Sequence, residues 1–419
     1  MLTRAPKGTR DILPPESYKW RYIEKVTAGI CNNFGYKEIR TPVFEHTELF
    51  QRGVGDTTDI VQKEMYTFLD KGERSITLRP EGTAGVVRSY IESGMSSLPQ
   101  PVKLYYNISA YRYEKMQKGR YREFHQFGAE AFGSAGPSID AEIISMLDLL
   151  FKRLGIENVE LNINSIGCPK CRTGYNESLK EFLSPSLDAL CETCRDRFHR
   201  NPLRIMDCKE EKCKKITAGA PSLLESLCEE CREHFEGLKS GLENLGIKYN
   251  IDKGIVRGLD YYTKTVFEFV SNNVGAQGTI CGGGRYDGLV GACGGTPAPG
   301  IGFGLGIERL LIEMQSQGVE IPEEDKTAVF IAAVGDKASL YAEKLVYKLR
   351  SSGIAAEKDL MNRSLKAQMK YADKIGAEFA LVLGDEEINS SKAMLKNMKN
   401  GEQKEVILDS LLDELKIRR

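Results

Sequence analysis

The chain has 419 residues, of which 41% are hydrophobic and 28% charged, and a formal net charge of −1. This length predicts two or three domains, and the near-zero charge excludes a globally basic surface, so any nucleic-acid contact must use local patches. No uninterrupted apolar run approaches the ~20 residues of a membrane span. Residues 1–17 lack the apolar core of a signal peptide. We therefore expect a cytoplasmic protein with no membrane partner.

The larger, N-terminal part of the chain has the pattern of a mostly β structure with helices laid against it. An amphipathic stripe predicts a helix over residues 15–33, and the alternating run 36–41 predicts a strand that ends at Pro42. Because turns join neighbouring strands, we expect an α+β fold built on an antiparallel sheet. Further strands are predicted at 75–79, 102–113, 123–132, 266–270 and 279–281, helices at 82–92 and 139–154, and a strand-to-helix unit at 301–314.

A polar stretch with glycine and proline at 315–326 predicts a domain boundary. Beyond it, strands at 328–334, 355–360 and 379–383 alternate with helices at 340–349 and 365–375, which is typical of a small α/β domain. On the second of these helices Lys366, Lys370 and Lys374 lie one turn apart. They form either a phosphate-facing stripe or a solvated face, and the spacing alone favours the solvated face.

Residues 111–130 predict a β-hairpin whose two alternating runs flank a break at Lys118 and Gly119. Unpaired charges are costly to bury, so the charged surface of this hairpin is not expected to be core. A nucleotide would suit it, because guanidinium groups bind phosphate and a phenyl ring stacks on a base. The alternative is a solvated hairpin with paired charges. Alternation groups Arg112 and Glu114 on the first arm, and Arg122, Phe124, Gln126 and Glu130 on the second.

Four other segments combine polar side chains with glycine. Glu81, Gly82 and Thr83 stand where a strand meets a helix, and suit either a bound ammonium group or a helix cap. The segments 257–262 (RGLDYY), 281–288 (CGGGRYDG) and 302–309 (GFGLGIER) add cations, phenols and glycines that allow close ligand approach. No P-loop, HExxH or GxSxG motif is present, and 302–309 lacks the spacing of a dinucleotide-binding loop. Together the segments are typical of polyphosphate chemistry without a P-loop.

Eleven cysteines are many for a reducing compartment, and eight of them lie between residues 168 and 231. Eight thiolates would serve two closed, structural four-cysteine zinc sites in a segment with little apolar core. A small domain of free thiols is the alternative, and the spacing leaves the two nearly even. The eight form three CxxC pairs and one looser pair: Cys168/Cys171, Cys191/Cys194, Cys228/Cys231 and Cys208/Cys213.

Three segments of the N-terminal part, at 35–45, 112–124 and 302–309, resemble the motifs of class II aminoacyl-tRNA synthetases. Residues 35–45, with Pro42, resemble the first motif, and 302–309 resemble the third. The runs 257–268 (RGLDYYTKTVFE) and 282–289 (GGGRYDGL) are similar to marks of the histidyl-tRNA synthetase family within that class. Many members of the family lack the cysteines of the insertion, so the zinc expectation rests on spacing alone. The residues that resemble the second motif are Arg112, Glu114, Arg120 and Phe124.

The resemblance covers the chain from its KGTRDILPPE opening to the C-terminal α/β domain. It implies a class II catalytic domain at 1–322 with a cysteine-rich insertion at 165–235, and an anticodon-binding domain at 326–419. It also implies a histidine–tRNA ligase that uses ATP with Mg²⁺ to form histidyl-adenylate from L-histidine. The histidyl group then passes to the 3′ end of tRNA(His). Because the first motif of the class builds a dimer interface, the resemblance implies a homodimer.

The resemblance further implies roles for single residues. The catalytic set is Arg112 and Arg257, on opposite sides of the α-phosphate, and Arg309 at the γ-phosphate. The ATP-binding set is Arg112, Glu114 near the adenine amino group, Arg120, Phe124 stacked on adenine, and Arg309. The histidine-binding set is Glu81, Gly82, Thr83, Arg112, Gln126, Glu130, Arg257, Tyr261, Tyr262 and Tyr286. Within it Glu81, Thr83 and Gln126 take the α-amino group, Glu130 and Tyr262 the two imidazole nitrogens, and Tyr261 and Tyr286 wall the pocket.

Two other functions remain as alternatives. A regulatory paralogue that binds a partner enzyme of histidine biosynthesis would typically lack the C-terminal domain and the full 257–268 run, and this chain retains both. A plain nucleotide- or RNA-binding module would leave the combination of Glu81, Gln126, Glu130 and Tyr262 unexplained. Histidine-dependent exchange of labelled pyrophosphate into ATP would separate the three.

Overall fold

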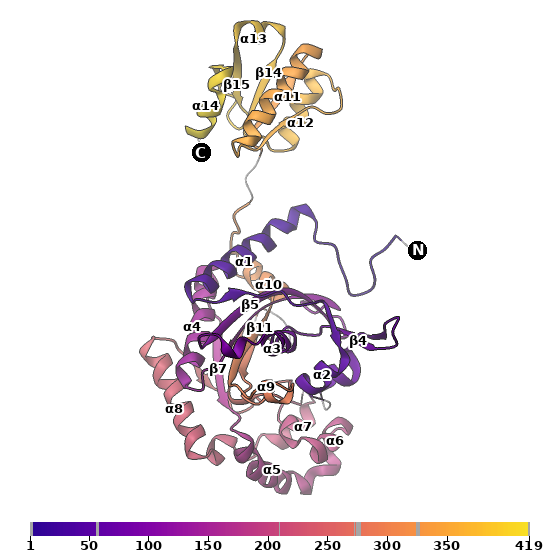
Figure 1. The fold of residues 1–419 in the computed structure, drawn as a ribbon, viewed down its shortest axis with the longest axis vertical. Coiled ribbons are helices and arrows are strands. Elements are labelled where there is room, and N and C mark those ends of the chain that lie inside the picture. The colour runs from indigo at the N-terminus through magenta and orange to yellow at the C-terminus, as the bar shows by residue number, and fades with distance from the viewer. Residues whose placement is uncertain are drawn as a thin grey trace. The chain divides into compact units, whose positions relative to one another are not determined.

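The computed structural model in Figure 1 describes residues 3–55, 58–208, 210–271, 273, 278–323 and 327–417. The chain divides into two compact units, Met1–Ile321 and Pro322–Arg419, and each is described by itself. Among the residues in those ranges, no helix is long and apolar enough to cross a membrane.

The centre of the first unit is an eight-stranded sheet with the order β1-β5-β6-β11-β10-β9-β7-β8. Neighbours from β5 to β7 pair antiparallel, whereas β1 on β5 and β8 on β7 pair parallel. This arrangement confirms the predicted α+β class. The strands are β1 (Lys37–Glu38), β5 (Val102–Tyr111), β6 (Glu123–Phe132), β7 (Glu160–Ser165), β8 (Asn250–Ile251), β9 (Thr263–Val270), β10 (Thr279–Arg285) and β11 (Gly300–Gly306).

Alternation along the strands separates the two faces of this sheet. On β6, Phe127 and Ala129 point into the larger core, which helices α1 (Pro14–Asn33), α4 (Pro137–Arg153), α8 (Glu229–Asn244) and α10 (Ile307–Ser316) cover. Phe132 belongs to a smaller core on the other face, under α3 (Thr83–Glu92) and α9 (Leu289–Ala292). Figure 1 shows α4 and α8 on one side of the strands and α2 (Thr47–Val54), α3 and α9 toward the other. The polar segments from the sequence converge on the α3 side.

A buried ionic network joins the sheet to the helices of the larger core. Arg285, on β10, is fully buried and donates to Asp140 Oδ1 at 2.5 Å. The second oxygen of Asp140 lies 2.8 Å from His234 Nε2, on α8. Removing one member would leave an uncompensated buried charge, so the network specifies how α4, α8 and β10 meet.

A hairpin is present, but the prediction of its first arm is wrong, because Arg112 and Glu114 lie in the loop and not on a strand. Strands β5 and β6 pair from Val102↔Phe132 to Tyr111↔Glu123, and residues 112–122 form the loop between them. The strand predicted at 36–41 is reduced to the two residues of β1. A separate three-stranded sheet has the order β2-β4-β3, with β2 (Phe44–His46), β3 (Thr67–Leu69) and β4 (Ser75–Leu78).

Between β7 and β8 the chain forms a helical insertion with a small core in which cysteines pack among leucines. None of the eleven cysteines, all of which lie in the described residues, forms a disulfide. The insertion consists of α5 (Pro169–Leu183), η3 (Ser184–Ala189), α6 (Glu192–Arg200), η4 (Pro202–Ile205), α7 (Glu211–Thr217), η5 (Leu223–Ser226) and α8.

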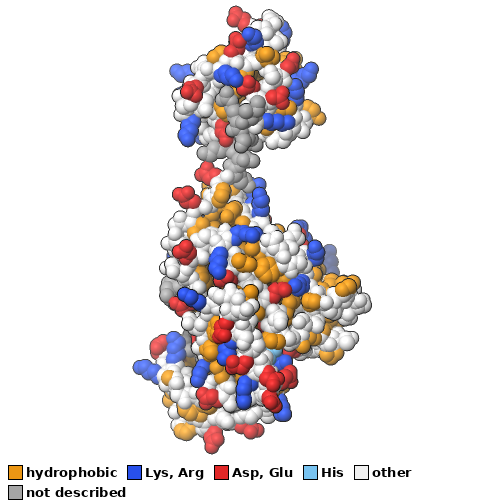
Figure 2. Space-filling model, turned by 90° about the vertical axis from the view of Figure 1, so that its left-hand side faces the viewer, with side chains coloured by type: hydrophobic (Ala, Val, Ile, Leu, Met, Phe, Trp, Pro, Cys, Tyr) orange, Lys and Arg blue, Asp and Glu red, His pale blue; other side chains and the backbone are white. Residues whose placement is uncertain are grey.

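The second unit has a five-stranded sheet with the order β13-β12-β14-β15-β16. The predicted alternation of three strands and two helices is present as β12 (Val329–Ala333), α11 (Asp336–Ser351), β13 (Ala356–Lys358), α12 (Leu365–Lys374) and β14 (Phe379–Leu383), and these strands pair parallel. The sequence analysis missed α13 (Asp385–Ser390), β15 (Lys392–Asn397), β16 (Gln403–Ile407) and α14 (Leu411–Ile417). On the face shown in Figure 2, acidic and basic side chains are mixed over each unit, as the near-zero net charge leads one to expect.

Candidate active site

The centre of the site is the carboxylate of Glu130, on β6, which is fully buried. Thr83 Oγ1 and Tyr106 OH donate to its Oε1 at 2.8 and 3.0 Å, and Tyr286 OH donates to its Oε2 at 2.5 Å. Burial raises the pKa of Glu130 to about 8, although the hydroxyls of Tyr286 and Thr83 oppose the shift. Three hydroxyl donors on one buried carboxylate form a polar pocket floor rather than ordinary core.

Glycines surround this floor because larger residues would occupy the same space. A Cβ on Gly302, on the neighbouring strand β11, would overlap the carboxylate of Glu130. The sequence analysis assigned such glycines to an approaching ligand, whereas these make room for the site's own side chains. In the same way Gly304 stands against Gln126, Gly128 against Tyr106, Gly300 against Tyr286, and Gly282 against Arg257.

The segment at the start of α3 both caps the helix and completes the floor. The Glu81 carboxylate accepts the backbone N–H of Thr83 at 2.6 Å and of Ala84 at 2.8 Å, so Glu81 itself is the cap. Gln126 Oε1 accepts the N–H of Gly82 at 3.0 Å. Burial raises the pKa of Glu81. Each of these oxygens has a second lone pair, which leaves them able to accept a further donor such as an ammonium group.

Three of the second-motif residues lie at the two ends of the loop between β5 and β6, and the fourth, Phe124, follows on β6. Arg112 Nε donates to the carbonyl of Pro80 at 2.7 Å, and its guanidinium carbon lies 5.3 Å from the ring centroid of Phe124. Glu114 receives Arg120 at 3.1 Å and Arg112 at 3.6 Å. The structure therefore brings these four residues together, with cations beside the exposed part of an aromatic ring.

Arg257 precedes β9 and has a φ of 60°, which is unusual for a residue with a side chain. Its guanidinium pairs with Glu268, and its carbon lies 5.9 Å from the Tyr262 ring centroid. Burial acts to lower the pKa of Arg257, but the charge of Glu268 outweighs it and raises the pKa above its ordinary value. Arg257 therefore remains a cation in a partly buried position.

Two further arginines, Arg309 of the predicted sets and Arg122 of the hairpin pattern, have different surroundings. Arg309, on α10, donates to the carbonyl of Thr279, and burial lowers its pKa. Arg122, which the hairpin pattern grouped with Phe124, instead lies 3.6 Å from the ring centroid of Tyr113. Arg309 therefore lies beside the strands of the site, whereas Arg122 packs on an aromatic ring of the loop.

The rings of three tyrosines, two of them the residues that the resemblance assigned to the pocket wall, lie close together. The rings of Tyr261 and Tyr262 lie 4.7 Å apart, and those of Tyr261 and Tyr286 lie 5.7 Å apart. The hydroxyl that reaches Glu130 comes from Tyr286 and not from Tyr262. Burial raises the pKa of all three phenols, so they remain protonated donors.

The sequence analysis missed two residues that complete the site. Tyr106, on β5, donates to Glu130, and its parity along the strand would have indicated the same face. Glu268, on β9, received no role from its place at the end of the 257–268 run, yet it forms the ion pair with Arg257. Thr279 Oγ1 donates to the other oxygen of Glu268 at 2.8 Å.

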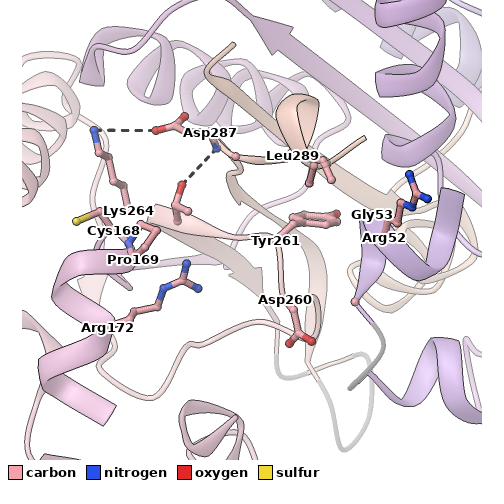
Figure 3. A pocket seen from close by; sticks show the side chains of 14 residues that line it. Arg52, Gly53, Cys168, Pro169, Arg172, Asp260, Tyr261, Lys264, Asp287 and Leu289 are labelled. Carbon is pink, nitrogen blue, oxygen red and sulfur yellow. Dashed lines mark hydrogen bonds and ion pairs between the residues drawn. The ribbon is translucent and has the colours of Figure 1, made fainter. Parts of the chain in front are cut away.

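A cavity of about 470 Å³ lies next to this site, on the far side of Tyr261 (Figure 3). Of the residues predicted to bind histidine or ATP, Tyr261 alone lines it, and Cys168 of the predicted metal ligands lines it too. The rest of the lining comes from α2 and its end, from the start of α5, and from the neighbourhood of Lys264 and Asp287. Tyr261 is therefore the residue through which this cavity adjoins the tyrosines of the site.

The eight predicted metal ligands form two groups of four, and within each group the sulfur atoms lie within 4.8 Å of one another. Tetrahedral zinc with Zn–S bonds of about 2.3 Å places its sulfurs about 3.8 Å apart. The sulfur atoms of Cys168 and Cys171 lie 3.6 Å apart and those of Cys191 and Cys208 lie 3.8 Å apart, which fits that geometry. The first group is Cys168, Cys171, Cys228 and Cys231, and the second is Cys191, Cys194, Cys208 and Cys213.

This fold and site define the catalytic unit of a class II aminoacyl-tRNA synthetase. Residues 8–310 match the family model described as Histidyl-tRNA synthetase, and residues 328–418 match the model described as Anticodon binding domain. The chain belongs to the histidyl-tRNA synthetase family.

Similar proteins agree over the full length. The histidine–tRNA ligase of Acetivibrio thermocellus is 73% identical over 417 residues, covering 100% of both chains. That of Caldanaerobacter subterraneus is 56% identical over 99% of this chain and 100% of its own. The crystal structure of apo histidyl-tRNA synthetase from S. aureus has a TM-score of 0.85 at 45% identity, and each chain is covered to 99%.

A more distant structure shares the fold alone. It is titled as an ATP phosphoribosyltransferase regulatory subunit/histidyl-tRNA synthetase from Bacillus halodurans, with 23% identity, a TM-score of 0.62, and coverage of 88% of this chain and 96% of its own. The fold therefore does not separate the synthetase from the regulatory alternative. The full-length identity to the ligases does, and the chain is an aminoacyl-tRNA synthetase.

Gly302→Ala should damage the floor of the site. The added Cβ displaces the Glu130 carboxylate from its hydroxyl donors, so the KM for histidine in pyrophosphate exchange should rise about 100-fold or more, as expected for loss of polar recognition. Gly29→Ala, in α1, is the matched control, because a Cβ there meets nothing within 4 Å. Equal KM values for the two variants would contradict the assigned position of Glu130.

Glu130 should also make stability depend on pH. Its pKa is raised to about 8 from an ordinary 4.5, so the folded protein binds more protons than the unfolded chain between those values. Stability contributed by this group therefore falls as the pH rises from 4.5 through 8. Glu130→Gln cannot ionise, so its unfolding midpoint relative to wild type should rise over that range. A constant difference across the range would show that Glu130 is already ionised at low pH.

Proposed function

We propose that this chain joins L-histidine to tRNA(His) in two steps. The histidine carboxylate attacks the α-phosphorus of ATP, a C–O–P bond forms, and pyrophosphate leaves. The 3′-terminal ribose hydroxyl of the tRNA then attacks the activated carbonyl carbon and releases AMP. The observation that carries the proposal is the buried carboxylate of Glu130 with its three hydroxyl donors, in a chain 73% identical to a histidine–tRNA ligase.

In the first step a carboxylate approaches an anionic phosphate, so the barrier depends on charge neutralisation and positioning. Arg112 and Arg257 are proposed to bind the α-phosphate from opposite sides. Arg257 suits this role because its pairing with Glu268 keeps it charged and fixed. Arg309 is proposed to bind the γ-phosphate. Mg²⁺ would accompany ATP and neutralise its phosphates.

The adenine site is proposed at the loop between β5 and β6. Phe124 would stack on the base, where the cation of Arg112 already lies against its ring. Glu114 would accept from the adenine amino group, and Arg120, its present partner, would support that carboxylate.

The histidine site is proposed on the floor around Glu130. Glu81, Gln126 and Thr83 would receive the α-ammonium group, since the first two offer acceptor oxygens at the start of α3. Glu130 and Tyr262 would bind the two imidazole nitrogens. Tyr261 and Tyr286 would enclose the ring, and the backbone at Gly82 would border the substrate.

The partners proposed are tRNA(His) and a second copy of the chain. The second unit, which matches an anticodon-binding model, would bind the anticodon end; on its α12, Lys366, Lys370 and Lys374 are exposed and could contact phosphates. For the homodimer, apolar side chains stand exposed on and beside the three-stranded sheet, next to the first-motif segment, as a subunit interface requires. They are Val43, Phe44, Phe68 and Leu69.

Two structural Zn²⁺ ions, one for each group of four cysteines, belong to the same proposal. The donor set fits, because four thiolates at tetrahedral spacing are the common structural zinc site. With all four positions taken by sulfur, neither ion would meet a substrate. The cysteines of each group would hold the insertion together in place of a larger core.

The function is tested by exchange of labelled pyrophosphate into ATP. The purified full-length protein should catalyse exchange only when L-histidine is present, and should then charge tRNA(His). A regulatory paralogue or a plain nucleotide-binding module should show neither reaction. Folded protein that gives no histidine-dependent exchange would overturn the proposal.

Arg257→Ala should lower the adenylation rate by about 100-fold or more, because it removes charge stabilisation from the transition state. Histidine affinity, measured by calorimetry without ATP, should be nearly retained. The double variant Arg257→Ala/Glu268→Gln controls for the unpaired carboxylate, and Arg74→Ala, exposed and paired with Asp70, controls for loss of a surface arginine. An equal loss of histidine binding would contradict the proposed role.

A further inference from the structure

We propose that the two four-cysteine groups of the insertion bind zinc and together clamp the active-site segment 257–264 in its working conformation. The inference rests on the proposed function, since it gives the insertion a role in that reaction. Residues of this clamp are positioning residues, and none of them touches the proposed substrates.

The segment needs a restraint from outside. It has no regular secondary structure from 257 to 262, and it carries both Arg257 and the tyrosine wall. Arg257 and Lys264 have φ angles of 60° and 49°, in a region that residues with side chains rarely adopt. Such conformations persist only where surrounding contacts over-determine them. The insertion supplies those contacts.

The first cysteine group holds the C-terminal end of the segment. Ile166 N–H donates to the carbonyl of Lys264 at 2.8 Å, and Lys264 N–H donates to the carbonyl of Gly167 at 2.9 Å. Arg172 Nη1 donates to the carbonyl of Tyr262 at 3.2 Å. These partners flank Cys168 and Cys171 directly in the sequence, so metal at that group fixes them.

The second cysteine group holds the N-terminal end. Arg204 Nη1 donates to the carbonyl of Gly258 at 2.8 Å and lies 3.6 Å from Asp260 Oδ1. Asn201 Nδ2 donates to the same oxygen of Asp260 at 3.0 Å. Arg204 is only 6% exposed, so its contacts are made inside the protein rather than in solvent. Both donors lie between Cys194 and Cys208, two ligands of this group.

The cavity beside Tyr261 leaves the segment incompletely packed against the insertion. Figure 3 shows Cys168, Pro169 and Arg172 on one side of it and Asp260 and Tyr261 on the other. With open space between the insertion and this part of the segment, packing there is incomplete. The segment is therefore held mainly by the hydrogen bonds from residues that neighbour the two cysteine groups in the sequence.

The order of the two cysteine groups along the chain also fits a clamp. Cys168 and Cys171 close on Cys228 and Cys231, while the whole second group lies between these pairs in the sequence. Backbone N–H groups point at the sulfurs, with Cys228 N–H donating to Cys171 Sγ at 3.1 Å and Cys191 N–H to Cys213 Sγ at 3.3 Å. Such donors stabilise thiolates, which are the form that binds zinc.

Metal content tests the first half of the proposal. Full-length protein purified without chelator should contain two zinc ions per chain by elemental analysis. Cys168→Ser/Cys228→Ser, within one group, should keep about one zinc, whereas Cys168→Ser/Cys208→Ser, across groups, should keep none. Protein without zinc, or equal zinc content in both double variants, would overturn it.

Variants that leave all cysteines intact test the clamp. Asn201→Ala and Arg172→Met, which keeps the aliphatic stem, should each keep both zinc ions. Backbone amides of 257–264 should exchange hydrogen faster, and the adenylation rate should fall about 10-fold, as for other residues that support a site indirectly. Arg200→Ala is the matched control, since Arg200 on α6 is exposed and pairs with Asp196. Unchanged exchange in both clamp variants would overturn the clamp.

These outcomes differ from failure of the proposed function. If wild-type protein lacks histidine-dependent pyrophosphate exchange, the function fails, and hydrogen exchange at 257–264 still decides the clamp. If wild type is active and holds two zinc ions, but both variants match Arg200→Ala, the function stands and the clamp is wrong. Circular dichroism of each variant confirms that a loss of rate is not a loss of fold.

Discussion

The burial of a carboxylate on one face of a β-sheet is the constraint on which the rest of the site depends. Glu130 is fully buried, and an unpaired charge there would be strongly destabilising. It is tolerated because Thr83, Tyr106 and Tyr286 aim hydroxyls at it. Those bulky donors fit only because the facing strand positions are glycines. The glycines of β11, with Gly128 on β6, are thus a consequence of placing a polar floor inside a sheet, and they weaken a core that α1, α4 and α10 must complete on the other side.

Two arginines of the site are held with different firmness, Arg257 by a close ion pair and Arg112 by a longer one. This difference bears on how the site could bind a polyanionic substrate. Arg257 is paired with a carboxylate that Thr279 also binds, so its position is fixed before any ligand arrives. Arg112 lies 3.6 Å from Glu114 and is anchored through the Pro80 carbonyl, which leaves much of its guanidinium for a phosphate. A site that is preorganised at one arginine and adjustable at another can bind ATP and then hold the developing charge.

The sequence predicted the class of fold and most of the residues that the structure gathers, because alternation along β6 and the glycine segments are local signals. It could not predict Tyr106 or Glu268, which sit in ordinary-looking strands and matter only through partners far along the chain. The grouping of the cysteines has the same cause, since four pairs can combine in several ways and only tertiary structure selects one. Strands β15 and β16 were missed because charged residues interrupt their apolar alternation, as is common near a sheet edge.

The segment 257–264 shows how a distant part of the chain determines local geometry. Its conformation includes two left-handed residues with side chains, which local propensity would not choose. The contacts that hold it come from Gly167 and Arg172 at one end of the insertion and from Asn201 and Arg204 in its middle. The buried network of Arg285, Asp140 and His234 in turn fixes α8, the helix by which the insertion returns to the sheet. The insertion is therefore anchored to the same sheet whose segment 257–264 it contacts, and in the proposed clamp a change at its cysteines would reach Arg257, the proposed catalytic arginine, through a short chain of directed hydrogen bonds.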